Sequence, residues 1–463
     1  MRPAVAGRQV FRYHNDMKND VRSALFEGYT EPIRDALWGH IYLTPALAAL
    51  TESPPFMRLH RIMQLGPALR VYPGATHTRA GHSIGVYHLA RRLLSHLAEE
   101  GADTWLTPGG IKSFLCAALL HDLGHFPYTH SLKELSLEEH ETLTAKLIVK
   151  EPVKSLVSAA GGDPYLAAAI VDTAGQGAAG RGAVGQGAAG QGSGGNDSRE
   201  ELHFYRRLLS GALDPDKLDY LSRDARYCGV PYGAQDVDFI LSRLHPHPER
   251  GVDIDSKGIL GVESLLFSKY LMYRAVYWHR TVRSATAMVK KAILGGLEAG
   301  VIAGEDLYNL DDQGLFALAE ARAHPLFSLM DSVRNGGLFI AAAEIPFDEK
   351  AHRKLLPLKE RSRMEESLAA ELSTLLGKSL GADALIIDIP EPVSFESGLF
   401  VTDEDCPFSA SSSAFKSALL DAFVRSLRII RVFVDPRYEE IIKQRREGIL
   451  NITQKWLQLY KGE

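Results

Sequence analysis

Apolar residues recur at helical spacing through most of the first 300 or so residues of the chain. Leu89, Leu93, Leu94 and Leu97 follow one another at intervals of one, three or four residues, and residues 111–119 continue the pattern. Side chains at this spacing share one face of a helix and can be buried together. The spacing therefore predicts a mainly α-helical body for this part of the protein.

The helix expected around residues 108–120 carries signals for both of its ends. Thr107 is a suitable N-cap, and Pro108 fits the first helical turn, where a missing backbone N–H costs no hydrogen bond. Gly124 is expected to stop the helix. His121 and Asp122 therefore lie at its C-terminal end, where an imidazole and a carboxylate can share one metal ion.

The pattern changes after about residue 300. Charged helical stretches such as KERSRMEESLAAELSTLLG are mixed with β-like runs, namely ALIIDIPEPV, GLFVT and LRIIRVFVD. We expect a helical core at residues 1–300 and a smaller α+β lobe at residues 301–463. The lobe shows no metal-binding or nucleophile motif, so packing and subunit contact are its expected roles.

Residues 174–197 differ from both parts in composition. Gly, Ala and Gln dominate this stretch, and GQGAAG occurs twice, beginning at residues 175 and 185. Such a sequence has too little apolar surface to offset the entropy lost on ordering. We expect a flexible surface insert within the helical core, because candidate site residues stand on both sides of it.

Composition argues against several classes of protein. Lys and Arg total 52 against 57 Asp and Glu, a formal net charge of -5, so a nucleic-acid coat or a membrane-surface protein is not favoured. Cys116, Cys228 and Cys406 are far apart and odd in number, which argues against a disulfide framework. The sequence has no signal-peptide core and no run of about 18 apolar residues. We expect a cytoplasmic protein without membrane contact.

Four residues form the strongest chemical motif, in the order His, His-Asp, Asp: His82, His121, Asp122 and Asp216. Any one of them alone is more often a packed or solvated side chain. Together their nitrogen and oxygen donors suit one divalent transition metal, Fe, Mn or Zn, with coordination positions open for water and phosphate oxygen. This order is that of an HD metal site and predicts a phosphohydrolase.

Longer stretches between about residues 30 and 297 resemble a known family. They are EPIRDALWGHIYL, FMRLHRIMQLG, VYPGATHTRAGHSIGV, HDLGHFPYTH, LDPDKLDYLSRD and YRAVYWHRTVRSA. In this order they resemble the sterile-alpha-motif/HD family of deoxynucleoside triphosphate triphosphohydrolases and their bacterial relatives. The resemblance implies a mainly α fold with an HD-domain phosphohydrolase core, in the bacterial-type architecture without a sterile-alpha-motif domain.

The resemblance also implies a catalytic group beside the metal ligands. His125 and His130 would surround the α-phosphate, His140 would support them, and His130 is our choice for the acid that protonates the departing 5′ oxygen. The family usually has an acidic residue three places after this histidine, where this chain has Lys133. Glu134 either fills that role or leaves His130 without a carboxylate partner and slower in turnover.

One predicted helix face presents Asp216, Tyr220 and Asp224 in line, because these residues are four positions apart. Without further context such a face is more often solvated. By resemblance, Lys217 binds the triphosphate, and Tyr220 and Asp224 hold the sugar hydroxyl.

The stretch 261–293 interleaves aromatic residues with cations and is expected to form another helix. Lys269 and Arg283 are among the cations that could balance a triphosphate, together with any Mg²⁺ that the nucleotide brings. By resemblance, Tyr277 packs under the sugar and leaves no room for a 2′-hydroxyl; a core stripe shared with Tyr273 is the alternative. The family also places three further residues against the substrate, namely Gln64, Leu65 and Arg79.

A guanine nucleotide bridges subunits in this family, and the chain departs from the residues that bind it. Glu52, Met57 and His60 stand where an Asp, a Gln and an Arg are usual. A thioether cannot hydrogen-bond a base edge, and an imidazole carries less charge than a guanidinium at neutral pH. We expect constitutive activity or activation by another nucleotide.

The leading interpretation is a metal-dependent enzyme that splits a deoxynucleoside triphosphate into deoxynucleoside and inorganic triphosphate, as a homodimer or homotetramer. One alternative is a phosphodiesterase or nucleotidase acting on another phosphoester, including a nucleic-acid end. A second alternative is a nucleotide-sensing assembly module with little turnover. Tyr277 with Leu65 favours the first, an extended basic groove would favour the second, and Lys133 with the altered activator positions favours the third.

Overall fold

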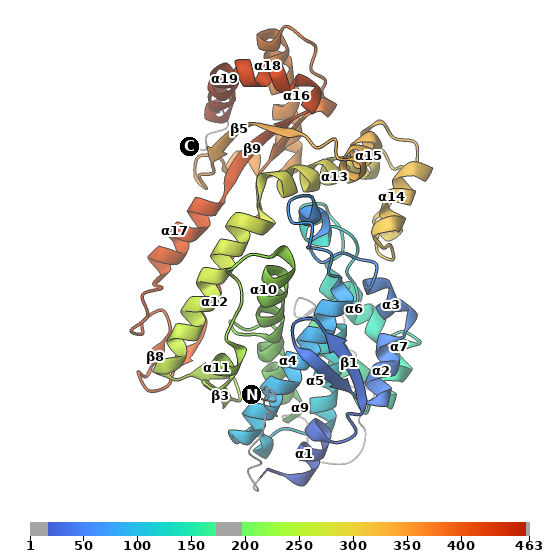
Figure 1. The fold of residues 1–463 in the computed structure, drawn as a ribbon, viewed down its shortest axis with the longest axis vertical. Helices are drawn as coiled ribbons and strands as arrows, with labels where there is room; N and C mark the ends of the chain where they lie inside the picture. The colour runs from blue at the N-terminus through green and yellow to red at the C-terminus, as the bar shows by residue number, and fades with distance from the viewer. Residues whose placement is uncertain (1–16, 173–196, 460–463) are drawn as a thin grey trace, which may run out of the picture.

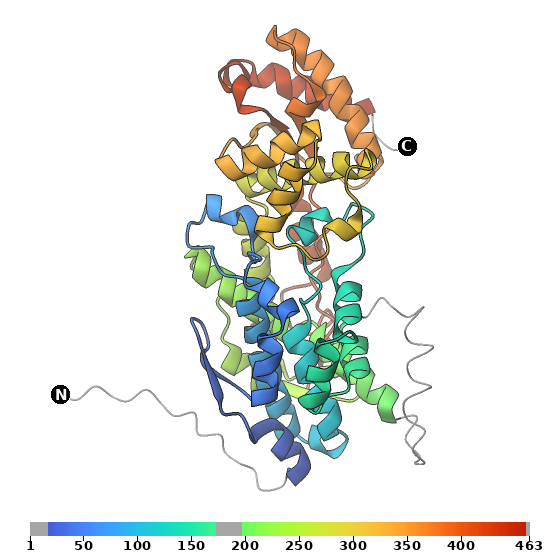
Figure 2. The ribbon, with the colours of Figure 1, turned by 90° about the vertical axis from the view of Figure 1, so that its right-hand side faces the viewer.

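The structure, a computed structural model, describes residues 17–172 and 197–459 (Figure 1). The molecule is elongated, with a helical core at one end and a smaller α+β lobe at the other (Figure 2). The Gly-rich insert expected at residues 174–197 lies outside the described residues, apart from its last residue. Its flexibility therefore stays a prediction.

Helices build most of the core, which confirms the mainly α fold predicted from the apolar spacing. None of the described helices is both long and apolar enough to span a membrane. The core helices are α1 (Asn19–Phe26), α2 (Pro45–Thr51), α3 (Pro54–Leu59), α4 (Arg79–Glu99), α5 (Pro108–Leu120), α6 (His140–Ile148), α7 (Val153–Ala159), α8 (Pro164–Val171), α9 (Asp197–Leu209), α10 (Pro215–Cys228), α11 (Val237–Leu241), α12 (Ile259–Met272) and α13 (Arg280–Glu298).

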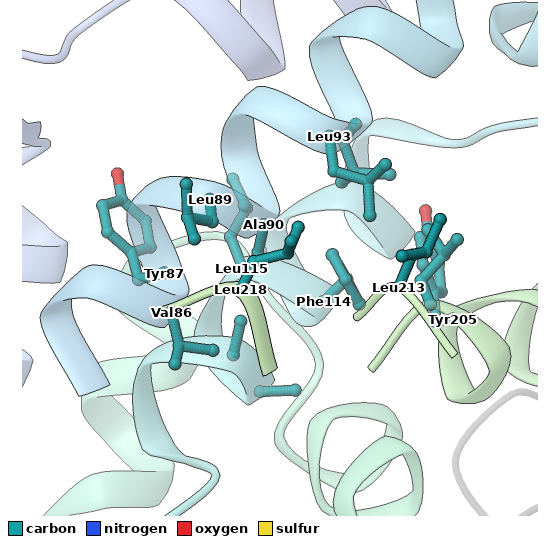
Figure 3. Close-up of a cluster of buried hydrophobic side chains, with 14 of the residues drawn as sticks. Val86, Tyr87, Leu89, Ala90, Leu93, Phe114, Leu115, Tyr205, Leu213 and Leu218 are labelled. Atoms are coloured by element: carbon teal, nitrogen blue, oxygen red, sulfur yellow. The ribbon is translucent and has the colours of Figure 1, made fainter. Parts of the chain in front are cut away.

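Helices α4, α5 and α10 pack together and position the site. Thr107 caps α5 as predicted, because its hydroxyl oxygen accepts a hydrogen bond from the backbone N–H of Gly110 over 3.0 Å. Figure 3 shows Leu89 of α4, Phe114 of α5 and Leu218 of α10 in one apolar cluster, and all three side chains are buried. Apolar contact of this kind holds the three helices in a fixed arrangement.

Three small sheets accompany the helices. An antiparallel hairpin of β1 (Glu31–Asp35) and β2 (Gly39–Leu43) lies beside the core. A sheet in the order β3-β4-β7-β8 joins β3 (Leu244–His247), β4 (Gly251–Ile254), β7 (Phe400–Val401) and β8 (Cys406–Pro407). The lobe holds an antiparallel sheet in the order β5-β9-β6, formed by β5 (Ile340–Pro346), β9 (Ile429–Val434) and β6 (Leu385–Asp388).

The remaining helices surround the sheet of the lobe or connect it to the core (Figure 1). They are α14 (Asp312–Ala321), α15 (Ser328–Asn335), α16 (Leu358–Leu376), α17 (Ser417–Leu427), α18 (Glu439–Gln444) and α19 (Arg446–Leu459). The predicted α+β character of this region is confirmed.

The single helix expected over residues 261–293 is interrupted. Helix α12 passes into a π turn at Tyr273–Tyr277, and α13 starts only at Arg280. His279 caps the new helix, because its Nδ1 accepts a hydrogen bond from the backbone N–H of Thr281 over 3.2 Å. The interruption changes the direction of the chain beside the cavity described below, which the apolar spacing alone does not reveal.

Residues 389–428 return from the lobe to the core. The run GLFVT was expected in the lobe, but its β7 pairs in parallel with β4 through Ile254 and Val401. Val393 and Phe395 join the apolar cluster of the core, and α17 lies beside α12 (Figure 1). The division of the chain at residue 300 stays a prediction, but this segment brings residues from the second part next to the site.

Candidate active site

Three helices bring the four predicted metal ligands to one point. Helix α4 supplies His82, the C-terminal end of α5 supplies His121 and Asp122, and the first turn of α10 supplies Asp216. His82 Nε2 lies 3.0 Å from Asp216 Oδ1, and His121 Nε2 lies 3.4 Å from Asp122 Oδ1 and 3.9 Å from Asp216 Oδ1. The donor atoms of His82, His121 and Asp122 all lie within 4.8 Å of one another.

Hydrogen bonds orient the two imidazoles of this group. His121 Nδ1 donates to the carbonyl oxygen of Ala118 over 3.0 Å, and its buried Nε2 makes no hydrogen bond to any described residue. His82 Nδ1 lies 2.8 Å from Asp219 Oδ2. A buried lone pair without a partner is costly, and a carboxylate behind an imidazole is the usual support of a metal-ligating histidine. The four residues therefore fit a divalent metal ion.

Asp122 is held as a carboxylate. Its Oδ2 accepts a hydrogen bond from Arg79 Nη1 over 2.7 Å, and its Oδ1 lies 3.0 Å from His125 Nε2. Burial would raise the pKa of Asp122, but His125, His121 and Arg79 hold it well below its usual value. Arg79 also lines the cavity. Its guanidinium can therefore hold Asp122 and contact a bound anion at the same time.

The three predicted catalytic histidines pack against one another, in edge-to-face or tilted arrangements. The ring of His125 lies 3.9 Å from that of His140 and 4.8 Å from that of His130, between ring centres. His130 and His140 line the cavity, whereas His125 is fully buried and is not among the lining residues. His130 is exposed towards this cavity, and partial desolvation there, together with Arg79, His140 and Lys133, lowers its pKa below the usual value. This shift favours the neutral imidazole of His130 before an anion binds.

Glu134 does not take the expected place beside His130. Its carboxylate forms ion pairs with Lys290 of α13 and Arg361 of α16 instead. Lys133 lines the cavity but brings a positive charge where the family has an acid. Besides Asp122, which contacts His125, a second carboxylate reaches the histidine cluster at His140. It comes from Glu141, which the sequence interpretation missed.

Glu141 lies in the first turn of α6 and lines the cavity. Its Oε2 is 3.0 Å from His140 Nδ1, and the nearby His140 outweighs the effect of burial and lowers the pKa of Glu141 to about 2. The only sequence signal was its place beside His140 in EEHET.

His130, His140 and the four predicted metal ligands line one cavity of about 560 Å³. Five residues that the resemblance assigns to the substrate line this cavity, namely Gln64, Leu65, Tyr220, Asp224 and Tyr277. The amide Oε1 of Gln64 is buried and has no hydrogen-bond partner among the described residues. This oxygen is free to accept a hydrogen bond from a ligand.

Asp224 joins two parts of the cavity wall. Its Oδ2 accepts a hydrogen bond from the Tyr277 hydroxyl over 2.6 Å, and its Oδ1 lies 2.8 Å from His77 Nε2. His77 was missed in the sequence, although it stands in the quoted stretch VYPGATHTRAGHSIGV. The ring of Tyr220 lies 6.4 Å from that of Tyr277, measured between ring centres, so two phenols lie side by side on this wall.

Two cations that line the cavity, Lys217 and Arg283, are already paired with carboxylates of the protein. Lys217 Nζ donates to Asp214 Oδ2 over 2.6 Å and to the Gly211 carbonyl over 2.9 Å, and lies 2.7 Å from Glu396 Oε2. Arg283 Nη2 donates to Asp388 over 2.6 Å. Both cations line the cavity, but a ligand meets them together with their carboxylates.

Lys269 does not line the cavity that it was expected to serve. Its Nζ donates to the carbonyl oxygen of Ser394 over 2.8 Å and sits 5.8 Å from the ring centre of Phe395. Burial lowers its pKa. Lys269 holds the returning segment in place and is not among the residues that line the cavity.

Comparisons with known proteins agree with this geometry. The model of the HD domain matches residues 79–167, and the model of the HD associated region matches residues 236–459. An uncharacterized protein of Methanocaldococcus jannaschii is 31% identical over 302 residues, which cover 65% of this chain and 57% of that protein. The deoxynucleoside triphosphate triphosphohydrolase SAMHD1 homolog of Dictyostelium discoideum is 25% identical over 297 residues, 62% of this chain and 52% of that protein.

The chain spans about half the length of these two relatives. Among solved structures, a phosphohydrolase from Bacteroides thetaiotaomicron has a TM-score of 0.64 at 23% identity, covering 88% of this chain and 99% of that one. At this identity the likeness shows the fold alone. With an HD domain carrying the ligand group and an HD-associated region after it, the chain belongs to the family of HD-domain phosphohydrolases.

Proposed function

We propose that this protein hydrolyses deoxynucleoside triphosphates to deoxynucleoside and inorganic triphosphate, with one divalent transition ion, Fe, Mn or Zn. One observation carries the proposal. The His-Asp group and the Tyr277–Asp224 pair line the same cavity. A nucleotide whose α-phosphate is held at the His-Asp group would place its sugar against Tyr277 and Asp224.

Recognition of the sugar is assigned to the wall formed by Tyr277, Tyr220 and Asp224. A phenol ring packed under the ring of the sugar would crowd a 2′-hydroxyl and leave it without a hydrogen bond, and both effects disfavour a ribonucleotide. Gln64, with its unpartnered oxygen, can accept a hydrogen bond from the 3′-hydroxyl. Leu65 covers the sugar from the opposite side.

A divalent ion held by His82, His121, Asp122 and Asp216 would supply Lewis-acid polarisation of phosphate oxygens and an activated water. Attack on the α-phosphorus breaks its bond to the 5′ oxygen, and we assign His130 to protonate this oxygen. Its lowered pKa rises when a polyanion enters, because nearby negative charge favours the charged form. His130 can then hold the proton that it delivers.

The support for His130 differs from that of the usual arrangement. Glu134 is ion-paired elsewhere, so the carboxylate of Glu141 acts through His140, which lies against His130 with a distance of 5.3 Å between ring centres. We assign Glu141 and His140 as positioning residues that keep His130 oriented.

The relatives support the same substrate class. The Dictyostelium relative is named as a deoxynucleoside triphosphate triphosphohydrolase, and it matches over 62% of this chain. We further propose a homodimer or homotetramer, which light scattering of the purified protein tests directly.

A second function, hydrolysis of a phosphoester with fewer phosphates, is favoured by one observation. Carboxylates outnumber Lys and Arg side chains along the cavity, and Lys217 is ion-paired with Glu396. A monophosphate or phosphodiester needs less positive charge than a triphosphate.

Product analysis with a panel of substrates tests both functions. The metal-analysed protein is incubated with dNTPs, NTPs, deoxynucleoside monophosphates and phosphodiesters, and triphosphate is separated from pyrophosphate and phosphate. Triphosphate released from dNTPs supports the proposal. Phosphate released mainly from monophosphates would replace it with the second function, and absence of turnover on every compound would leave a sensing module.

A further inference from the structure

The segment after β6 brings two carboxylates to the part of the cavity that is lined by Lys217 and Arg283. Glu391 and Glu396 both line it, although they follow the lobe strand β6 in sequence. Glu391 Oε2 lies 3.4 Å from Arg283 Nη1, and Glu396 Oε2 lies 2.7 Å from Lys217 Nζ. A substrate phosphate tail would meet the same two cations.

Lys217 has no donor left for a ligand while Glu396 is in place. An ammonium group has three N–H donors, and they point to Asp214, the Gly211 carbonyl and Glu396. Asp214 is buried and also caps α10 by accepting from the backbone N–H of Lys217 over 2.7 Å. The Glu396 side chain is 43% exposed, so it is the partner that a phosphate can displace.

We infer that Glu396 is a specificity-determining residue whose carboxylate occupies the position of a phosphate group on Lys217. It thereby sets how strongly the cavity favours a polyphosphate tail over a single phosphate. The inference rests on the proposed function only in assuming that phosphate groups enter this cavity. Displacing Glu396 costs the ion pair and the exposed hydrogen bond from Ser394, and the carboxylate that stays nearby repels the added negative charge.

The neighbours of Glu396 are anchored, so its side chain can move without release of the segment. Phe395 packs on Phe423 of α17 with 5.8 Å between ring centres, and the Ser394 carbonyl accepts from Lys269 over 2.8 Å. The Ser394 hydroxyl also donates to Glu396 Oε1 over 3.0 Å at an exposed position. Rotation of the Glu396 side chain, with loss of this hydrogen bond, is therefore enough to free Lys217.

The test measures binding of inorganic tripolyphosphate and of a deoxynucleoside monophosphate by titration calorimetry, with no turnover required. Glu396→Gln keeps the size of the side chain and removes its charge. Tripolyphosphate should bind roughly two- to fivefold more tightly to this variant, the range expected for one partly exposed ion pair. The affinity for the monophosphate should change by less. The gain in tripolyphosphate affinity should shrink as salt is added, because screening weakens charge repulsion.

Glu404→Gln is the matched control, because Glu404 lies on the same returning segment but contacts Ser412 and does not line the cavity. It should bind both ligands as the native protein does. Unchanged or weaker tripolyphosphate binding by a folded Glu396→Gln protein would overturn the inference, as would an equal gain for the monophosphate. If only the proposed function is wrong, Glu396→Gln should still bind tripolyphosphate more tightly, although no dNTP is hydrolysed.

Discussion

The hydroxyl of Tyr277 donates a hydrogen bond to Asp224 Oδ2 over 2.6 Å and thereby joins the π turn to helix α10. The other oxygen of Asp224 lies 2.8 Å from His77. Burial, reinforced by the charge of Asp224, raises the pKa of Tyr277 well above its usual value. The phenol is therefore neutral and acts as a donor, and its ring is fixed against the cavity.

Two variants of Tyr277 distinguish the effect of its ring from the effect of its hydrogen bond to Asp224 on the preference for deoxyribose over ribose. Tyr277→Ala should narrow the preference for dATP over ATP by on the order of tenfold, because space opens under the sugar. Tyr277→Phe keeps the ring and should keep most of the preference, although Asp224 loses one donor. The ratio of kcat/KM for the two nucleotides measures both. Equal rates on dATP and ATP with the native protein would exclude this role for Tyr277.

Metal retention should depend on Asp219 as well as on the four ligands. Asp122→Ala should lose the bound metal and the activity together, since it removes a donor from the centre of the group. Asp219→Asn removes the negative charge behind His82, a charge that also forms a buried ion pair with Arg223. With folding checked by circular dichroism, it should weaken metal affinity by about 10- to 100-fold. Elemental analysis after dialysis against a graded chelator checks both variants.

Asp238→Asn is the control for these two changes, because Asp238 pairs with Arg92 at the surface away from the site. It should retain metal as the native protein does. Full metal content in Asp122→Ala would show that the ion is held elsewhere.

Much of the site could be predicted because its residues lie on regular helices. Helical spacing and end signals placed His121 and Asp122 at the end of α5, and the four-residue spacing placed Tyr220 and Asp224 beside Asp216 on α10. Such relations depend on local geometry, which the sequence specifies directly.

Partners across elements could not be predicted in the same way. Lys269 and Glu134 were expected at the substrate and beside His130. Instead Lys269 contacts Ser394 of the returning segment, and Glu134 contacts Arg361 of α16. Glu396 reaches Lys217 because the neighbouring Ser394 and Phe395 are anchored on α12 and α17, which are far from Lys217 in sequence. Pairings of this kind depend on the packing of the whole fold and leave no periodic signal in either segment.

Selective activation by guanine nucleotides should be absent. Met57 is 43% exposed on the short helix α3 and offers no hydrogen bond to a base. Partial desolvation together with Arg61 lowers the pKa of His60, which favours its uncharged form. Each lost hydrogen bond costs about 1 to 3 kcal/mol of discrimination. We expect dATP hydrolysis and oligomer mass to be the same with and without saturating GTP or dGTP. A large guanine-specific stimulation with assembly would contradict this interpretation of Met57.

Acid stability should depend on the buried ion pair between Asp388 and Arg283, which joins the lobe to α13. Burial would raise the pKa of Asp388, but Arg283 and Lys290 lower it below its usual value. Because the pKa in the folded state is lower than in the unfolded state, the contribution is fully present above about pH 4. It is lost as the pH falls through the pKa of the folded state.

Asp388→Asn should therefore reduce stability at pH 7, on the order of 3 kcal/mol for a broken buried pair, and flatten the loss of stability below pH 4. Asp331→Asn is the comparison, since Asp331 faces Arg334 at the surface over 3.4 Å and should change stability by about 0.5 kcal/mol or less. Urea unfolding midpoints at pH 7 and at pH 3.5 measure both effects. If the two variants lose the same stability at pH 7, the pair does not hold the lobe on α13, and the acid sensitivity must come from other carboxylates.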